Sequence, residues 1–190
     1  QVAGVPTLIG RTGYTGEDGF ELFFPREKAQ WLWDRLMEAG APFGLKPIGL
    51  AARDSLRFEA KMPLYGQEIS AAINPIQAGL SWAVAFDKGD FIGRSALLKA
   101  KLEGSPLRLV GIEMLDRGVP RHAYPVALGG RPIGQVTTGM FAPTLGKYLA
   151  LAYVPKEQAA LGTELQVIIR GEPRRAQVVK TPFYTPAYRR

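Results

Sequence analysis

The chain has 190 residues, of which 46% are hydrophobic, and a formal net charge of +7. This length and apolar content allow one large domain or two small ones with buried cores, and no apolar run approaches the roughly 20 residues that cross a bilayer. Because there is no cysteine and only one histidine, His122, the composition excludes disulfides, thiol nucleophiles, and thiolate or histidine-rich metal sites.

The first sixty residues predict two strands followed by two helices. Strand-like Val5–Arg11 and Phe20–Phe24 flank a turn-rich stretch, Thr12–Gly19. Pro25–Gly40 is predicted as a helix because its apolar residues keep i, i+3, i+4 spacing. A second helix is predicted over Pro47–Ala60, since proline suits a first helical turn.

The next forty residues lead to a predicted domain boundary. Pro63 and Gly66 indicate a loop, Leu80–Phe86 is predicted as a strand, and Arg94–Leu102 as a short basic helix. Gly104-Ser105-Pro106 is a break in the pattern and divides the chain into residues 1–104 and 105–190.

Beyond that break the apolar pattern has a period of two, which is typical of half-buried strands. Gly129-Gly130 and Arg170-Gly171-Glu172-Pro173 are predicted hairpin turns. Several short strands in about 80 residues indicate a small antiparallel barrel or sandwich. The predicted strands are Leu107–Met114, Tyr124–Leu128, Ile133–Thr137, Leu149–Val154, Leu165–Arg170 and Ala176–Lys180.

The charge is unevenly distributed. Residues 1–100 contain 11 Lys/Arg and 11 Asp/Glu, whereas residues 101–190 contain 13 and 6, so the whole excess lies in the second half. Such a surface favours an anionic partner. The alternative is a solvated basic surface that only aids solubility.

Two segments carry candidate binding groups. The glycine-rich turn Gly13–Glu21 ends on a carboxylate, Glu21, which suits a ligand with paired N–H donors but also fits an ordinary solvent-facing hairpin position. In the second helix Arg53 and Arg57 lie one turn apart, and Asp54 can pair with Arg57. That arginine face suits either a ligand or intrahelical salt bridges.

Taken together, these segments resemble the aminomethyltransferase (T-protein) family of the glycine cleavage system. One departure is Lys61, where the family usually has glycine. The resemblance covers essentially the whole chain and is carried by the runs Gly13–Glu21, Leu50–Ala60, Pro63–Gly66, Gly79–Trp82, Ile133–Gly139 and Thr181–Tyr184.

The resemblance implies a tetrahydrofolate-dependent transfer of a methylene group from an aminomethylated lipoyl carrier protein, with release of ammonia. The folate-facing residues would be Tyr14, Glu21, Arg53, Trp82 and Tyr188. Glu21 would accept hydrogen bonds from the pterin amino group and ring N–H, and the aromatic side chains would cover the rings. Trp82 also suits plain core packing.

The resemblance further implies an α+β fold, in which residues 1–104 form the second half of a folate-binding domain and residues 105–190 a C-terminal β-barrel. The family's catalytic aspartate comes from an N-terminal portion ahead of this segment, so no catalytic residue is assigned here, and His122 is interpreted as structural or surface. The implied partners are the lipoyl carrier (H-protein) and that N-terminal portion, in cis or in trans. The implied location is the cytoplasm, or the mitochondrial matrix in a eukaryote.

Two alternatives remain. One is another folate-binding one-carbon protein of the same superfamily, such as a demethylase or a folate sensor. The other is a basic β-barrel module that binds nucleic acid, although the aromatic residues do not alternate with Arg and Lys along the strands as a stacking platform requires.

Overall fold

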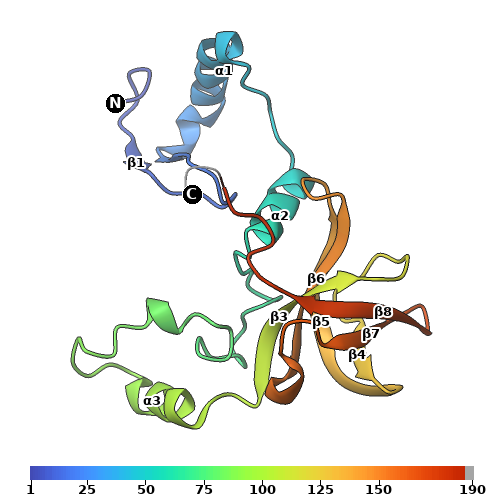
Figure 1. Cartoon of the computed structure of the whole chain (residues 1–190). Coiled ribbons are helices and arrows are strands. Elements are labelled where there is room, and N and C mark those ends of the chain that lie inside the picture. Colours follow the sequence, from blue (N-terminus) through green and yellow to red (C-terminus); the bar gives the residue numbers. More distant parts are fainter. Residues whose placement is uncertain (187–190) are drawn as a thin grey trace. The chain divides into compact units, whose positions relative to one another are not determined.

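The computed structural model describes residues 1–186 and contains two compact units (Figure 1). The first contains Gln1–Met62 and residues 185–186, and the second is Pro63–Tyr184. No helix in the described part is long and apolar enough to cross a membrane.

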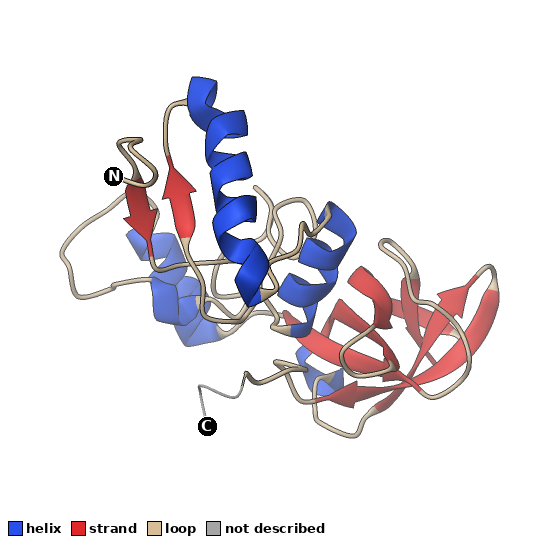
Figure 2. Ribbon diagram, turned by 90° about the horizontal axis from the view of Figure 1, so that it is seen from above, coloured by secondary structure: helices blue, strands red, loops and turns tan. Residues whose placement is uncertain are grey.

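The first unit contains the predicted pairs of strands and helices. Strands β1 (Leu8–Gly10) and β2 (Glu21–Phe23) pair antiparallel, with Gly10 opposite Glu21. They lie beside helix α1 (Ala29–Gly40), as Figure 2 shows. Helix α2 (Leu50–Glu59) follows. The small core contains Val5, Leu32 and Phe58, which are buried.

Helix α2 ends in a turn that holds Lys61 in an unusual backbone conformation. The Lys61 N–H donates to the Phe58 carbonyl and the Met62 N–H to the Arg57 carbonyl. This pair of bonds defines a Schellman motif, in which the residue just past the helix cap, here Lys61, adopts a left-handed conformation. Lys61 has φ 58°, a region that glycine enters without steric cost. Glycine would therefore fit this backbone better than the lysine found here.

The second unit is built around a closed antiparallel barrel with strand order β3-β6-β5-β4-β7-β8, which confirms the predicted barrel and the α+β class. Its interior is a continuous apolar cluster that includes Ile112, Val126 and Val154. The turn at Arg170 and Gly171 has positive φ at both residues, as a tight hairpin requires. The strands are β3 (Leu107–Met114), β4 (Pro125–Leu128), β5 (Arg131–Ala142), β6 (Lys147–Pro155), β7 (Glu164–Ile169) and β8 (Glu172–Val179).

The predicted strand Leu80–Phe86 is wrong. This stretch holds a 3-10 turn at Ser81–Ala83 and has no strand pairing in the described structure. Its backbone groups are satisfied locally instead, since Ala83 N–H donates to the Leu80 carbonyl and the Arg94 guanidinium donates to the Phe86 carbonyl. The predicted helix after it is confirmed as α3 (Arg94–Glu103). The boundary at residue 104 stays a prediction.

Candidate functional site

The glycine-rich turn between β1 and β2 is held by side-chain contacts within the first unit. The Thr12 hydroxyl donates to Glu21 Oε2 at 2.5 Å, which fixes one carboxylate oxygen of an otherwise exposed side chain. Gly16 has φ 79°, and a Cβ there would stand 2.5 Å from the Ala60 Cβ. The turn therefore approaches the end of α2 too closely for any larger residue, and it lines a pocket of about 360 Å³.

Asp18 in the same turn is committed to an ion pair. The Arg11 guanidinium donates to both Asp18 carboxylate oxygens, at 3.1 and 2.8 Å. The hydrogen bond and charge of Arg11 hold the pKa of Asp18 below its usual value, and Asp18 in turn raises the pKa of Arg11. Asp18 is thus kept ionised, which does not suit a group that must exchange a proton near neutral pH.

The two arginines of α2 have separate environments. Arg57 is 1% exposed and donates from Nε to Asp54 Oδ1 at 2.7 Å and from Nη1 to the Met62 carbonyl at 3.3 Å, so it is an internal brace of the helix end. Arg53 is exposed, and its guanidinium carbon lies 4.5 Å from the centre of the Tyr14 ring. Such cation–π stacking orients a guanidinium while leaving its N–H groups able to bind a ligand.

The structure brings two of the five predicted folate-binding residues together. Tyr14 and Arg53 are stacked, and Glu21 lies in the same unit but contacts Thr12. Trp82 belongs to the other unit and is 82% exposed, so the core-packing interpretation of this residue is wrong. Tyr188 lies outside the described residues.

The sequence reasoning missed a buried carboxylate, Glu68. It is fully buried, and Oε1 accepts from the Thr137 and Thr138 hydroxyls at 2.7 and 2.6 Å, while Oε2 accepts from Leu64 N–H at 3.0 Å. The Tyr153 hydroxyl donates to the Glu68 carbonyl at 2.8 Å. Burial, and then the negative charge of Glu68, raise the pKa of Tyr153. These bonds fasten the loop after Met62 to the barrel.

A bulge in strand β5 allows Thr137 and Thr138 to donate to Glu68 together. Neighbouring residues of a regular strand point to opposite faces. The pairing of β5 with β6 shifts between Val136 and Thr138, so Thr137 is the extra residue of a β-bulge. Both threonine hydroxyls therefore reach the same Glu68 oxygen. In the sequence, Thr137 and Thr138 are adjacent polar residues within an apolar strand, and this pattern could have indicated a buried polar contact here.

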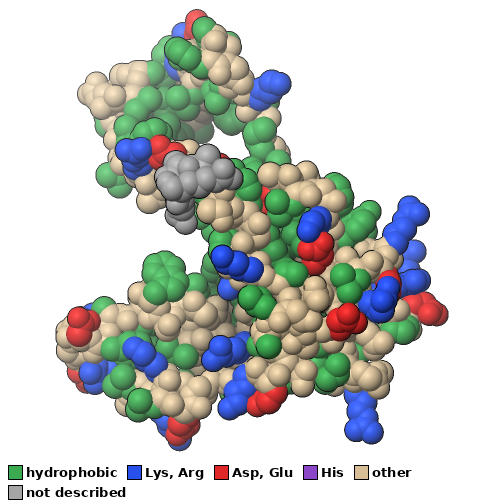
Figure 3. Space-filling model, in the orientation of Figure 1, with side chains coloured by type: hydrophobic (Ala, Val, Ile, Leu, Met, Phe, Trp, Pro, Cys, Tyr) green, Lys and Arg blue, Asp and Glu red, His purple; other side chains and the backbone are tan. Residues whose placement is uncertain are grey.

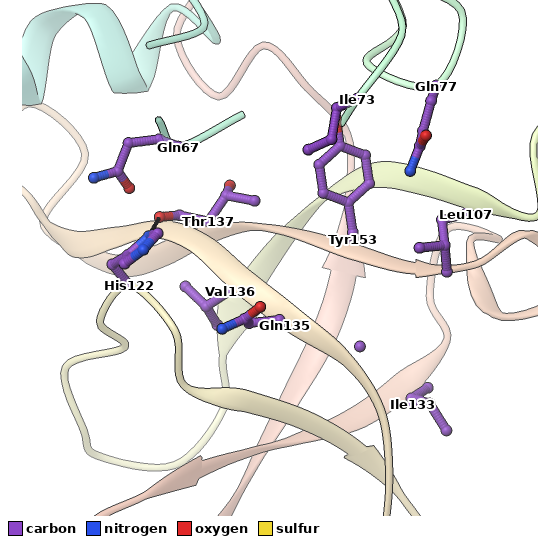
Figure 4. Close-up of a pocket in the computed structure, with 11 residues that line it drawn as sticks. Gln67, Ile73, Gln77, Leu107, His122, Ile133, Gln135, Val136, Thr137 and Tyr153 are labelled. Atoms are coloured by element: carbon purple, nitrogen blue, oxygen red, sulfur yellow. Dashed lines mark hydrogen bonds between the residues drawn. The ribbon is translucent and has the colours of Figure 1, made fainter. Parts of the chain in front are cut away.

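A pocket of about 470 Å³ lies beside this fastening (Figure 4). Its polar groups include Gln67, Gln77 and Gln135, together with His122, whose Nδ1 lies 2.6 Å from the Thr137 carbonyl. No charged residue of the described chain lines it.

A second pocket of the barrel, about 460 Å³, is lined by four arginines, Arg117, Arg121, Arg170 and Arg174, against a single carboxylate, Glu172. Lys and Arg side chains project from the barrel in Figure 3. The loop that contributes Arg117 and Gly118 to this pocket lies close to the β7–β8 hairpin. The Asp116 carboxylate accepts from the Arg175 backbone N–H at 2.8 Å. A Cβ on Gly118 would stand 2.7 Å from Ile169 Cδ1, so the loop lies against the β7–β8 hairpin.

Comparison with known proteins decides the family. Residues 1–88 match the model of the GCVT N-terminal domain, and residues 108–185 match the glycine cleavage T-protein C-terminal barrel domain. The chain belongs to the glycine cleavage T-protein family. It is 60% identical over 191 residues to an aminomethyltransferase of Symbiobacterium thermophilum and 51% identical over 190 residues to one of Caldanaerobacter subterraneus, covering 100% of this chain in each case.

A solved T-protein has the same fold. The crystal structure of glycine cleavage system aminomethyltransferase T from Bartonella henselae matches 93% of this chain with a TM-score of 0.87 and 36% identity. The chain spans about half the length of the curated relatives it matches, 51% of each of the two named above, and 49% of the Bartonella chain.

Proposed function

We propose that the protein containing this chain transfers the methylene group of an aminomethylated lipoyl carrier to tetrahydrofolate and releases ammonia. The observation that carries the proposal is the pair of Arg53 and Tyr14 beside a glycine-rich turn that ends on Glu21, within a chain of the T-protein family. A demethylase or a folate sensor would share the same binding groups, and the family match favours the transferase.

In this proposal the residues of this chain bind and orient the folate. Glu21 accepts hydrogen bonds from the pterin amino group and its neighbouring ring N–H through its two carboxylate oxygens, since Oε2 keeps a second lone pair beside the bond from Thr12. Arg53, held over Tyr14, donates to a pterin carbonyl or a folate carboxylate. Trp82 and Tyr188 supply aromatic surface for the rings. We propose that the catalytic carboxylate comes from an N-terminal portion ahead of this segment and that the protein is cytoplasmic.

We propose that the carrier protein docks on the four-arginine pocket. Guanidinium groups bind carboxylates in a bidentate manner, and an acidic carrier surface presents several of them. The pocket brings four arginines together against one carboxylate, whereas Arg175 and Lys147 elsewhere on the barrel are paired with Asp116 and Glu113.

The substitution Glu21→Gln tests the folate site. It keeps the shape of the side chain but replaces an acceptor with a donor that faces the pterin amino group, so we expect tetrahydrofolate binding to weaken by about 2–3 kcal/mol. Calorimetric titration of the complete protein measures this, with Glu27→Gln as control because Glu27 is an exposed carboxylate outside the turn. A change of less than about twofold for Glu21→Gln would refute the assignment.

A further inference from the structure

We propose that Thr12 is a positioning residue that orients the Glu21 carboxylate for the folate, and that the ion pair of Arg11 with Asp18 holds Thr12 in place. This inference rests on the proposed function, in which Glu21 binds the pterin edge. Thr12 makes no contact with the ligand in this arrangement and acts only through Glu21.

The Glu21 side chain needs a support from outside its own strand. It is exposed at the first residue of β2, and the residue opposite on β1 is Gly10, which has no side chain to pack against it. A ligand that binds an unrestrained glutamate must fix its rotamer, and the lost side-chain entropy weakens binding. Among the described residues, the Thr12 hydroxyl is the only hydrogen-bond partner of the Glu21 carboxylate. Thr12 therefore sets the orientation of this group.

The Thr12 hydroxyl orients the carboxylate without using up its binding capacity. A hydroxyl has one proton and an ionised carboxylate only accepts, so the Thr12 proton goes to Glu21 Oε2, 2.5 Å away. Oε1 and the second lone pair of Oε2 remain for the two N–H donors of the pterin. Orientation by a single donor thus leaves both ligand contacts possible.

Gly10 leaves the room that this hydroxyl occupies. A Cβ on Gly10 would stand 2.9 Å from Thr12 Oγ1, which is too close for the hydroxyl to stay where it is. The backbone of Gly10 belongs to strand β1 and does not lie in the left-handed region, so alanine would strain no backbone there. Alanine would instead push the hydroxyl away from Glu21.

The ion pair of Arg11 with Asp18 restrains the segment that carries Thr12. The Arg11 guanidinium donates to both Asp18 oxygens, at 3.1 and 2.8 Å, so a bidentate contact closes the turn between β1 and β2. Arg11 directly precedes Thr12, and the contact therefore limits the positions from which the hydroxyl can reach Glu21. Both charged side chains are exposed, so we expect this restraint to be weaker than the direct bond.

Thr12→Val tests the orienting bond, because valine has the shape of threonine without the hydroxyl. We expect it to weaken binding of tetrahydrofolate to the complete protein about five- to tenfold, as the loss of one charge-assisted hydrogen bond predicts. Thr12→Ser keeps the hydroxyl and should stay within about twofold of the unmodified protein, whereas Asp18→Asn should weaken binding about two- to threefold. Thr7→Val is the matched control, since the Thr7 hydroxyl donates to the Val5 carbonyl in the same unit.

Gly10→Ala tests the same bond by another route, because it leaves threonine in place and removes only the space for its hydroxyl. It should weaken tetrahydrofolate binding about as much as Thr12→Val does. Equal affinity of Gly10→Ala and the unmodified protein would contradict the proposed geometry.

A double-mutant cycle separates positioning from a general effect on the turn. Glu21→Ala removes the acceptor, and in that background Thr12→Val should change tetrahydrofolate affinity by less than about twofold. With Glu21 present, Thr12→Val should raise the KM for tetrahydrofolate and leave kcat within about twofold, the signature of a lost binding contact. The urea midpoint should not move. A residue that only stabilises the turn would lower that midpoint and weaken binding equally in both backgrounds.

The outcomes separate this inference from the proposed function. Unchanged affinity in Thr12→Val, no recovery in Thr12→Ser, or equal losses with and without Glu21 would overturn the role of Thr12 while Glu21→Ala still weakens folate binding. Unchanged affinity in Asp18→Asn would overturn the role of the ion pair. If Glu21→Ala itself leaves tetrahydrofolate affinity unchanged, the folate contact of the proposed function is wrong, whatever the Thr12 variants do.

Discussion

Lys61 adopts its backbone conformation at a structural cost. Its backbone lies in the left-handed region at the end of α2, and burial of its side chain lowers the pKa of the ammonium group. The left-handed conformation costs a residue with a Cβ about 1–2 kcal/mol. Part of this is offset because glycine loses more freedom on folding.

We therefore expect Lys61→Gly to raise the free energy of unfolding by about 0.5–1 kcal/mol. Urea unfolding of the complete protein measures the change. Lys99→Gly is the control, because Lys99 lies inside helix α3, where glycine should destabilise by about 1 kcal/mol. A loss of stability in both variants would show that the conformation of Lys61 is not strained.

The contribution of Tyr153, which donates to the Glu68 carbonyl, to the stability of the fold depends on pH. Its pKa is raised in the folded protein, so folding favours the protonated phenol. A group of this kind stabilises the fold fully below its unfolded pKa of about 10, and this contribution is lost as the pH rises above that value.

We expect the Tyr153 hydroxyl to contribute about 1 kcal/mol relative to Tyr153→Phe at pH 8, where it donates to the Glu68 carbonyl. This difference should shrink between pH 10 and about 11. Denaturant unfolding of both proteins across this range measures it, and Tyr148→Phe on the same strand accounts for other titrating groups. A difference that stays constant with pH would contradict the prediction.

Among the elements, the barrel strands were predictable and the strand at residues 80–86 was not. Alternating apolar residues bury one face of β3 and β8, and that alternation is visible in the sequence. Residues 80–86 have a similar apolar content but no partner strand in the described structure, and partnering is a tertiary property that no local pattern reports.

The candidate site was predictable in residue type but not in arrangement. Helical spacing places Arg53 and Arg57 on one face, yet Arg57 is buried by Asp54 and the Met62 carbonyl, and Arg53 lies over Tyr14. The Glu68 fastening depends on a bulge and on contacts between residues about seventy positions apart, which a single sequence does not reveal.

The pairing of β5 with β6 depends on a glycine. A Cβ on Gly134 would stand 2.0 Å from the Tyr153 carbonyl oxygen, and a backbone atom of a paired strand cannot move aside. At Gly118 the closest atom to an added Cβ, at 2.7 Å, is the flexible end of the Ile169 side chain.

We expect Gly134→Ala to lower the free energy of unfolding by about 3 kcal/mol or more, and Gly118→Ala by less than about 1.5 kcal/mol. Thermal and urea unfolding of the complete protein test this order. Equal losses would mean that β6 can shift its register at this point.

At the scale of the whole molecule, the excess of positive charge lies in the second half of the chain. The four-arginine pocket gathers part of this charge in one place. Electrostatic steering acts over about 8–10 Å at physiological salt and mainly sets association rates.

We expect the association rate of the complete protein with its acidic carrier to fall about threefold or more between low and moderate salt. Arg170→Glu combined with Arg174→Glu should lower the rate and flatten its salt dependence. Arg131→Glu, an exposed arginine of the barrel outside the pocket, should do neither. Stopped-flow mixing measures all three proteins, and a rate that is independent of salt would point to a solvated surface.

The closure of the barrel by β3 and β8 also constrains how the protein is made. Among the barrel strands, the ribosome produces β3 first and β8 last. These two strands pair with each other, with Gly111 opposite Val179. Until β8 has been synthesised, β3 and β7 each keep an open edge, and open edges invite pairing with other chains. A nascent chain that stalls before β8 is therefore exposed to aggregation for the whole length of the pause, so completion of translation and not the folding of any single hairpin protects it.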